Sequence, residues 1–287
     1  MLVTGATTGI GRATALALAE RGDRVLLVAR DPARGEDALR ALRARADAAG
    51  RGGSGALLLA DLSRQADVRA LAGATRAALE ARGGRLDVLV NNAGAYFDRR
   101  DVTDDGIERT LALNHLAYFL LTRELLPQLR AAGAATRDAR VVIVASEAHQ
   151  AVRELDVEDL ELARGWSAMR AYAQSKLANV LLAYALARRL AGSGVTANAL
   201  HPGVIGSGFA AGTGGVMGLF FRLGRPLLPS PERGARTSVH LASDPGVRGA
   251  TGGYYKRARP ARSSALSHDV ALQEAVWAAS ERLVGIR

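Results

Sequence analysis

The chain has 287 residues, of which 48% are hydrophobic, a formal net charge of +10 and no cysteine. The lack of cysteine excludes disulfides, thiolate zinc sites and a thiol nucleophile, and no apolar run of about 18 or more residues predicts a membrane span. Length and composition fit one large α/β domain, 1–287. The chain becomes glycine-rich at its start, so no secretory signal is visible and we expect a cytoplasmic protein.

The positive charge comes from arginines that are dispersed along the chain. The densest basic run covers 256–262, and only Tyr254 and Tyr255 stand beside it for stacking on bases. We therefore interpret the charge as a solvated surface and expect no nucleic-acid partner. A basic nucleic-acid binder, whose binding would depend on salt, is the alternative.

The first element is a short apolar strand, 1–4, which runs into the glycine-rich turn 5–11 and then into an amphipathic helix. This arrangement aims backbone N–H groups and a helix N-terminus at a phosphate. The glycine spacing is GxxxGxG rather than the general dinucleotide pattern GxGxxG, and a tight connection without a ligand is the alternative. We predict a phosphate site here.

A second apolar strand, 24–29, ends at Arg30. At this place an acidic residue binds the ribose 2′-hydroxyl of NAD, whereas an arginine accommodates the 2′-phosphate of NADP. The strand end carries no carboxylate, although Asp31 follows directly. The sequence therefore predicts NADP(H), with a solvated arginine as the alternative.

Two further strands end in polar residues. Strand 56–60 is followed by Asp61 and Leu62, and the carboxylate could accept a hydrogen bond from the adenine amine. Strand 86–90 opens into the sequence NNAG at 91–94. Asparagine side chains can hold a turn, and the small residues after them would let a cofactor approach the backbone.

A long helix is expected over 103–129, and it is apolar on more than one side. Such a helix is buried between two layers, here the sheet and a partner subunit. We therefore expect a homodimer or homotetramer through this helix and the helix 171–190. Asn114 places a costly polar amide among apolar residues, which favours a kinked or water-holding site over a harmless exposed asparagine.

Ser146 stands at the C-terminal end of the strand 140–145. Open parallel sheets bind ligands at the edge formed by these strand ends. The irregular segment 147–169 is interpreted as an insertion beside the substrate, with its acidic residues in solvent. Tyr172 and Lys176 then lie one turn apart on the helix 171–190, and the chain contains one other lysine. A phenol beside a fixed positive charge loses its proton more easily and can serve as a general acid or base. Alone, this spacing also fits an ordinary helix face.

The last third begins with the strand 195–200, which ends in His201, Pro202 and Gly203. The segment 212–228 is equally typical of a mobile lid over an apolar substrate and of a core helix, and membrane-surface contact is a weaker option. A helix over 231–242, a strand over 251–255 and a helix over 266–284 complete the chain. The alternation predicts a doubly wound parallel sheet of about seven strands flanked by helices, with substrate-side segments near 147–169 and 207–230.

Taken together, these motifs resemble the short-chain dehydrogenase/reductase superfamily over essentially the whole chain. They are TGATTGIG at 4–11, Asp61-Leu62, NNAG at 91–94, Asn114, Ser146, YAQSK at 172–176 and HPG at 201–203. The stretches VASEAH, SKLANVL, GVTANALHPGV and GGYYKRARP are similar to the retinol dehydrogenase-like branch, which commonly uses NADP(H). The departures are the short first strand and Ala145, where this branch often has a second serine.

The resemblance implies a role for each matching residue. Tyr172 would be the general acid/base, Lys176 would lower its pKa and bind the nicotinamide ribose, Ser146 would polarise the carbonyl, and Asn114 would hold a water that links Lys176 to solvent. The implied cofactor-binding residues are Gly5, Thr8, Gly9, Ile10, Gly11, Arg30, Asp61, Leu62, Asn91, Ala93, Gly94, Tyr172, Lys176, Pro202, Gly203, Val204 and Ser207.

The sequence thus predicts an oxidoreductase that transfers hydride between NADP(H) and a carbonyl or alcohol substrate, without a metal. The resemblance favours a bulky, apolar small molecule. A catalytically silent NADP-binding regulator or scaffold on the same fold is the alternative. Such proteins typically lose the tyrosine or the lysine, and both are present here.

Overall fold

The apolar runs of the sequence form one eight-stranded sheet in the order β3-β2-β1-β4-β5-β6-β7-β8. The computed structural model describes residues 1–81, 83–203 and 229–286. Strands β1 to β7 are parallel and β8 is antiparallel to β7. The strands are β1 Leu2–Thr4, β2 Arg24–Ala29, β3 Ser54–Leu59, β4 Val88–Asn91, β5 Ala139–Val144, β6 Val195–His201, β7 Tyr254–Lys256 and β8 Arg259–Pro260. The predicted fold class is confirmed, with the short strand β8 added at the edge.

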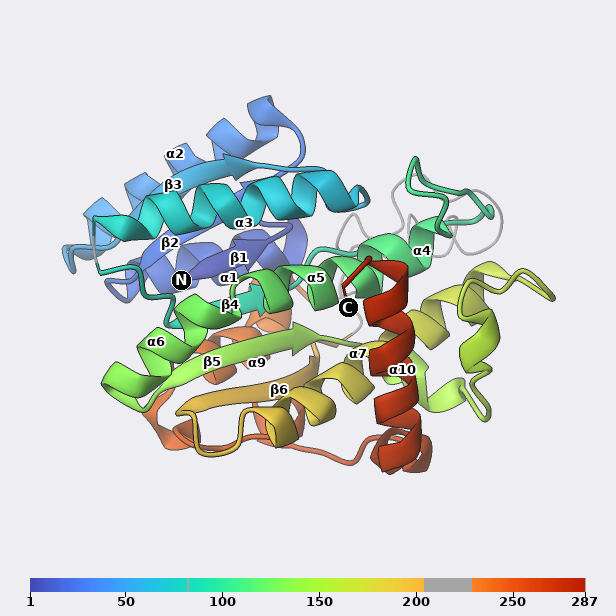
Figure 1. Cartoon of the computed structure of the whole chain (residues 1–287). Helices are drawn as coiled ribbons and strands as arrows, with labels where there is room; N and C mark the ends of the chain where they lie inside the picture. Colours follow the sequence, from blue (N-terminus) through green and yellow to red (C-terminus); the bar gives the residue numbers. More distant parts are fainter. Residues whose placement is uncertain (82, 204–228, 287) are drawn as a thin grey trace.

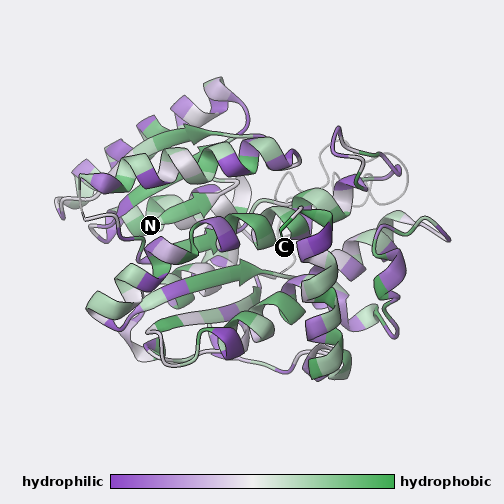
Figure 2. Ribbon diagram, viewed as in Figure 1, coloured by the Kyte–Doolittle hydropathy of each residue, from purple (hydrophilic) through white to green (hydrophobic). Residues whose placement is uncertain are grey.

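Side chains of β2 alternate between two hydrophobic cores, because successive residues of a strand point to opposite faces. Leu26 and Val28 lie in the core under α3 (Gln65–Glu80), α5 (Ala117–Glu124) and α7 (Ala168–Arg189). Val25 and Leu27 lie in the core under α1 (Gly9–Glu20), α2 (Pro32–Ala49) and α9 (Pro231–Ser243). The sheet is therefore covered on both faces, as its continuous apolar strands require. Figure 1 shows these layers, and Figure 2 shows mostly apolar strands with hydrophilic residues concentrated on the outer helices and loops.

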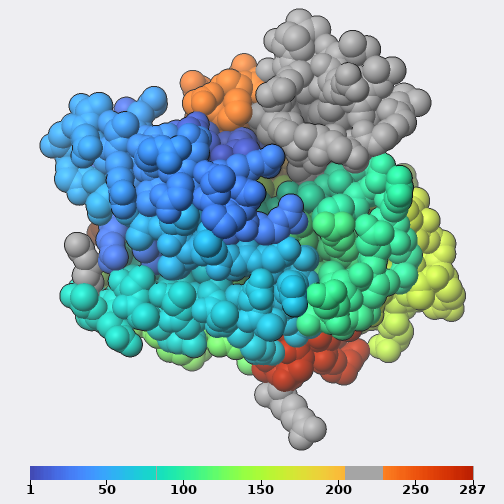
Figure 3. Space-filling model, turned by 90° about the horizontal axis from the view of Figure 1, so that it is seen from above, coloured from blue at the N-terminus to red at the C-terminus, as the bar shows by residue number. Residues whose placement is uncertain are grey.

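In the described residues, most α-helices connect strands and cover the two faces of the sheet, whereas α10 follows the last strand and packs on α7. The described helices are α1 Gly9–Glu20, α2 Pro32–Ala49, α3 Gln65–Glu80, α4 Arg109–Leu111, α5 Ala117–Glu124, α6 Leu126–Thr136, α7 Ala168–Arg189, α9 Pro231–Ser243 and α10 Val270–Leu283. In Figure 3 the N-terminal part of the chain, in blue, lies directly beside the middle part, in cyan and green, and the two form one continuous molecular surface.

The helix expected over 103–129 is wrong at its start and in its continuity. A turn precedes it, in which Thr103 donates its N–H to Ile107 O at 2.8 Å and Gly106 has a φ of +77°. Helix α4 begins at Arg109, continues through the π-helical turn η1 (Ala112–Leu116) into α5, and stops at Leu125. Pro127 in the first turn of α6 explains the break, because proline clashes with the preceding helical turn.

Two other predicted elements also differ. The helix expected over 266–284 is divided into a 3₁₀ turn, Ala265–His268, and α10, because Asp269 caps the new helix by accepting a hydrogen bond from Leu272 N at 3.1 Å. The acidic residues of 147–169 are not all in solvent, since Glu161 accepts the N–H of Glu108 at 3.0 Å. The predicted lid or core helix at 212–228 lies outside the described residues.

Helix α7 is buried almost entirely between 171 and 187. It packs against the sheet, the η1–α5 segment and α10, which lies across it in Figure 1. Much of its apolar surface is therefore covered within the chain, and the homo-oligomer through this helix stays a prediction. In the part of the chain that the structure describes, no helix combines the length and apolarity that a membrane crossing requires.

Candidate active site

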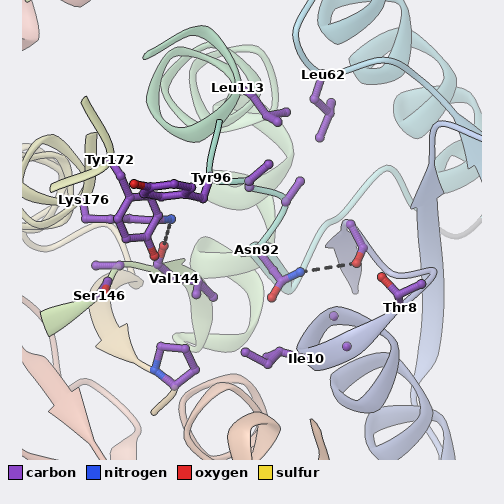
Figure 4. Close-up of a pocket in the computed structure, with 18 of the residues that line it drawn as sticks. Thr8, Ile10, Leu62, Asn92, Tyr96, Leu113, Val144, Ser146, Tyr172 and Lys176 are labelled. Carbon is purple, nitrogen blue, oxygen red and sulfur yellow. Dashed lines mark hydrogen bonds between the residues drawn. The ribbon is translucent and has the colours of Figure 1, made fainter. Parts of the chain in front are cut away.

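A cavity of about 740 Å³ opens at the C-terminal ends of the parallel strands. Its wall combines the turns after β1, β2, β3 and β4 with the ends of β5 and β6 and the first turns of α7. Figure 4 shows side chains from these elements around the cavity. The predicted site residues on this wall are Gly5, Thr8, Gly9, Ile10, Gly11, Arg30, Asp61, Leu62, Ala93, Gly94, Ser146, Tyr172, Lys176, Pro202 and Gly203. Val204 and Ser207 lie outside the described residues.

The glycine turn fits a phosphate group. Gly5 and Gly9 have φ values of +65° and +54°, which favour glycine. A Cβ on Gly11 would meet Gly5 O at 2.2 Å and Asn92 Nδ2 at 2.4 Å. Thr8 is the N-cap residue of α1, and its side chain makes no capping hydrogen bond among the described residues. The N-terminus of α1 therefore presents its first N–H groups and its positive dipole end to the cavity.

Asn92 holds this turn against the end of β4. Its Nδ2 donates to Thr4 O at 2.9 Å, and the Thr4 hydroxyl accepts the N–H groups of Asn92 and Ala93 at 2.8 and 3.0 Å. Asn91, in contrast, is fully buried and donates from Nδ2 to Thr122 Oγ1 at 3.0 Å. The structure thus places Asn92 on the cavity wall and Asn91 in the core, because neighbouring strand residues point to opposite faces.

The far end of the cavity is formed by Arg30 and Asp61. The Arg30 side chain is 66% exposed, and its Nη1 lies 3.9 Å from Asp61 Oδ2. Burial favours the protonated form of Asp61, but hydrogen bonds from Ser63 and the charge of Arg30 outweigh it and lower the pKa of this carboxyl. Asp31 caps α2 by accepting the Arg34 N–H at 2.8 Å. Its carboxylate is therefore committed to the helix, and Arg30 is the side chain that reaches the cavity.

At the other end, Ser146 at the exit of β5 faces Tyr172 on α7. Burial raises the pKa of Tyr172 to about 12, and a hydrogen bond with the Ser146 side chain partly offsets this. Burial also lowers the pKa of Lys176 to about 7. Lys176 Nζ donates to Val144 O at 3.2 Å and lies 5.6 Å from the centre of the Tyr172 ring (Figure 4).

The pKa of Tyr172 in the structure differs from the one that the resemblance implied. The resemblance implied that Lys176 lowers it, whereas the phenol has a raised pKa in the structure. The physical reason is that both groups are buried, and desolvation disfavours the charged form of each. Tyr172 is therefore protonated at neutral pH, which makes it a proton donor.

Asn114 lies behind the cavity rather than on its wall. Its side chain accepts the Ala95 N–H at 2.9 Å, and its Nδ2 donates to Ala95 O at 2.9 Å and to Ser175 Oγ at 3.2 Å. Its place in the π-helical turn η1 gives the expected irregularity in the helix. The asparagine is satisfied by the loop after β4 and by α7, and the water assigned to it stays a prediction.

Comparisons with known proteins decide the family. The family model described as short chain dehydrogenase matches residues 1–214. The chain belongs to the short-chain dehydrogenase family. Within it, the chain is 40% identical to the polyprenol dehydrogenase of Mus musculus over 99% of this chain and 83% of that protein. It is 36% identical to retinol dehydrogenase 12 of Homo sapiens, over 100% of this chain and 86% of that protein. The retinol dehydrogenase-like branch is therefore confirmed.

Solved structures agree with this assignment. The Pseudomonas aeruginosa RhlG/NADP active-site complex superimposes with a TM-score of 0.67 at 32% identity, covering 88% of this chain and 92% of that one. Members of this family use nicotinamide cofactors, so this dehydrogenase is an oxidoreductase for CH–OH or C=O groups. In its cavity, the N-terminus of α1 fits a cofactor pyrophosphate, and no cluster of His, Asp or Glu in the described residues could hold a metal ion.

Sequence reasoning missed the aromatic wall above Tyr172 of this dehydrogenase. The Tyr96 ring lies edge-on to Tyr172 with the ring centres 5.8 Å apart (Figure 4), and the Arg109 guanidinium lies 4.4 Å from the centre of the Phe97 ring. Leu113 and Met169 line the same cavity. The available signal was the aromatic pair Tyr96-Phe97, one residue after the predicted cofactor turn NNAG.

A charged cluster beside Ser146 was also missed. Glu147 carries an ion pair with Lys256, and its Oε2 lies 3.2 Å from His201 Nε2. The Glu147 N–H donates to His201 Nδ1 at 3.2 Å. Burial lowers the pKa of His201 to about 4, so this imidazole is neutral at physiological pH. The cluster joins the ends of β5, β6 and β7 next to the cavity and thereby holds the position of Ser146.

Proposed function

We propose that this dehydrogenase is an NADP(H)-dependent reductase that converts a bulky, apolar ketone or aldehyde into its alcohol. The observation that carries the proposal is the common cavity, which brings the protonated Tyr172 and its partner Ser146 to the same wall as the glycine turn. A nicotinamide, when bound, supplies the hydride. The protein must then deliver a proton to the substrate oxygen.

In the proposed reaction Ser146 donates a hydrogen bond to the substrate oxygen and orients it toward the phenol of Tyr172. As negative charge develops on that oxygen, Tyr172 transfers its proton to it. Lys176 Nζ lies 5.6 Å from the centre of the ring, and in its protonated form it stabilises the phenolate that remains. The same groups support alcohol oxidation in reverse, with Tyr172 as the general base.

The cofactor and substrate preferences rest on the two ends of the cavity. Arg30 at the end of β2 supports NADP over NAD, because a guanidinium accommodates a 2′-phosphate. The apolar substrate is supported by the aromatic wall with Tyr96 and Phe97 and by the names of the relatives, which are dehydrogenases of polyprenol and retinol. The cytoplasmic location stays a prediction from the sequence.

The test follows NADPH absorbance while the protein is offered all-trans-retinal, a polyprenal and 4-nitrobenzaldehyde. We expect turnover with at least one of them, and Tyr172→Phe should lower kcat by about 100-fold or more, the usual contribution of a general acid. Tyr184→Phe is the matched control, since Tyr184 on the same helix bonds Ser263 at 2.7 Å outside the cavity. Full turnover by Tyr172→Phe would refute the mechanism, and NADPH binding without any turnover would favour the silent regulator.

A further inference from the structure

Asn179 shares a buried carbonyl with Lys176. It follows Lys176 by three positions on α7 and so lies on the same helix face. Its Nδ2 donates to Asn114 O at 2.8 Å and, more weakly, to Val144 O at 3.5 Å. Lys176 Nζ donates to this same Val144 O at 3.2 Å. Asn179 therefore fixes the last carbonyl of β5 at the point where the lysine is held.

The chain of hydrogen bonds continues from Asn179 to the C-terminal helix. Asn179 Oδ1 lies 3.2 Å from His115 Nδ1, and His115 Nε2 lies 2.9 Å from Ser280 Oγ on α10. Because Asn179 Nδ2 faces two carbonyl acceptors, its Oδ1 must accept from His115, which therefore carries its proton on Nδ1. His115 Nε2 is then an acceptor that faces the Ser280 hydroxyl, whose single proton is shared between Nε2 and Val276 O at 2.7 Å.

The side chains of His115, Asn179 and Ser280 are buried and lie away from the cavity. His115 is 1% exposed, and Asn179 and Ser280 are fully buried. None of them lines the cavity. Burial, together with the nearby Lys176 charge, lowers the pKa of His115 to about 4, so the imidazole is neutral at physiological pH. The rings of Tyr118 and Tyr172 also face Lys176 Nζ, at 5.8 and 5.6 Å from their centres.

A buried polar chain of this length is costly unless it is fully paired. Apolar side chains could join α10 to the neighbouring helices at lower cost, as Phe119 of α5 and Trp277 of α10 do nearby with ring centres 4.9 Å apart. The polar chain instead ends on the Asn114 carbonyl and on the Val144 carbonyl, which also accepts from Lys176. Its effect is to keep the carbonyl that orients the ammonium in a single place.

We propose that Asn179, His115 and Ser280 are positioning residues that hold Lys176 in register with Tyr172, so that helix α10 is part of the catalytic apparatus. The proposal rests on the proposed function, because it assumes that Lys176 supports proton transfer. It assigns the C-terminal helix a role in turnover, in addition to its role in packing.

The test uses the scarcity of lysine. The chain contains two lysines, 176 and 256, so protein labelled with carbon-13 at lysine Cε gives two signals and the titration of Lys176 is read directly. In Ser280→Ala the Val144 carbonyl is less firmly held and stabilises the ammonium less. The Lys176 titration should therefore move to lower pH, and kcat for NADPH-dependent reduction of 4-nitrobenzaldehyde should fall about 3- to 10-fold, as the loss of one buried hydrogen bond implies.

Two variants separate positioning from simple loss of packing. Ser280→Thr keeps the hydroxyl and should restore both the titration and kcat. Thr75→Val is the matched control, because the buried Thr75 hydroxyl also bonds the carbonyl four residues before it, Leu71 O at 2.8 Å, but in α3. This control should lower Tm without moving the Lys176 signal. The Kd of NADPH should be the same in all three variants.

The outcomes distinguish the two proposals. If Lys176→Ala loses turnover while Ser280→Ala keeps the wild-type titration and kcat, the positioning role is wrong and the proposed function stands. If Lys176→Ala keeps full turnover, the proposed function is wrong and this inference is wrong with it. If Ser280→Ala and Thr75→Val lower kcat equally, the effect is one of stability and the positioning role is also wrong.

Discussion

Replacing Arg30 by alanine tests the choice of cofactor. The guanidinium stands at the end of β2 on the cavity wall, 66% exposed, with Asp61 Oδ2 as its partner at 3.9 Å. Asp31 cannot take its place, since that carboxylate caps α2. The substitution therefore removes the positive charge that would hold the 2′-phosphate and leaves the negative charge of Asp61 beside it, held by the hydrogen bonds from Ser63.

The size of the effect follows from exposure. A hydrogen bond to a charged group contributes about 1.5–3 kcal/mol when it is buried. At a side chain that is two-thirds exposed, solvent screening reduces this to about 1–1.5 kcal/mol. The KM of NADPH should therefore rise about 5- to 15-fold. The KM of NADH should change by less than about twofold, because NADH lacks the 2′-phosphate.

The assay measures kcat/KM for both cofactors with one carbonyl substrate, at low and at high salt. High salt should reduce the difference between wild type and variant, since exposed charges are screened. Arg45→Ala is the control, because Arg45 is also exposed and paired with a carboxylate, Glu20 at 3.3 Å, but lies away from the cavity. Equal losses for NADPH and NADH in Arg30→Ala would refute the assignment of Arg30 to the phosphate.

Three further predictions concern the fold and the cavity. The pKa of His115 is about 4 in the folded protein against 6.5 when it is unfolded. The folded state therefore favours the neutral imidazole, and about 3 kcal/mol of the free energy of unfolding is lost as the pH falls from 6.5 to 4. Urea unfolding at several pH values should show a smaller loss in His115→Gln than in the wild type. Gly11→Ala should lower the free energy of unfolding by about 1–3 kcal/mol and weaken NADPH binding, because the new Cβ would lie 2.2 Å from Gly5 O. Chemical unfolding measures the first effect and fluorescence titration with NADPH measures the second. Tyr96→Ala should raise the KM of apolar carbonyls roughly tenfold through lost apolar contact, with the Kd of NADPH unchanged in parallel titrations.

Much of the fold could be predicted because its signals are local. Apolar runs such as 24–29 indicate strands that are covered on both faces, and the structure bears this out in β2. The glycine turn after β1 needs backbone angles and close approaches that other residues oppose, so its glycines mark it in the sequence. The spacing of Tyr172 and Lys176 places them on one face of a helix whatever surrounds that helix.

Other features depend on contacts between distant segments. Pro127 indicates a helix break in the sequence. The apolar pattern of 103–129 suggested continuity, because both η1, which packs on α7, and α5, which packs on α3, are buried. Which asparagine of the NNAG sequence faces the cavity depended on the register of β4 beside β1. The aromatic wall at Tyr96 exists because the loop after β4 folds back toward α7.

The sequence by itself determined the order of strands and helices, the phosphate turn and the residues able to carry out proton transfer, because each of these depends on near neighbours in the chain. The tertiary structure alone decided the protonation of those residues. Burial by α7, η1 and the sheet raises the pKa of Tyr172 and lowers that of Lys176, and desolvation is a property of the whole surroundings. The link from Lys176 through His115 to α10 likewise joins residues that are far apart in sequence.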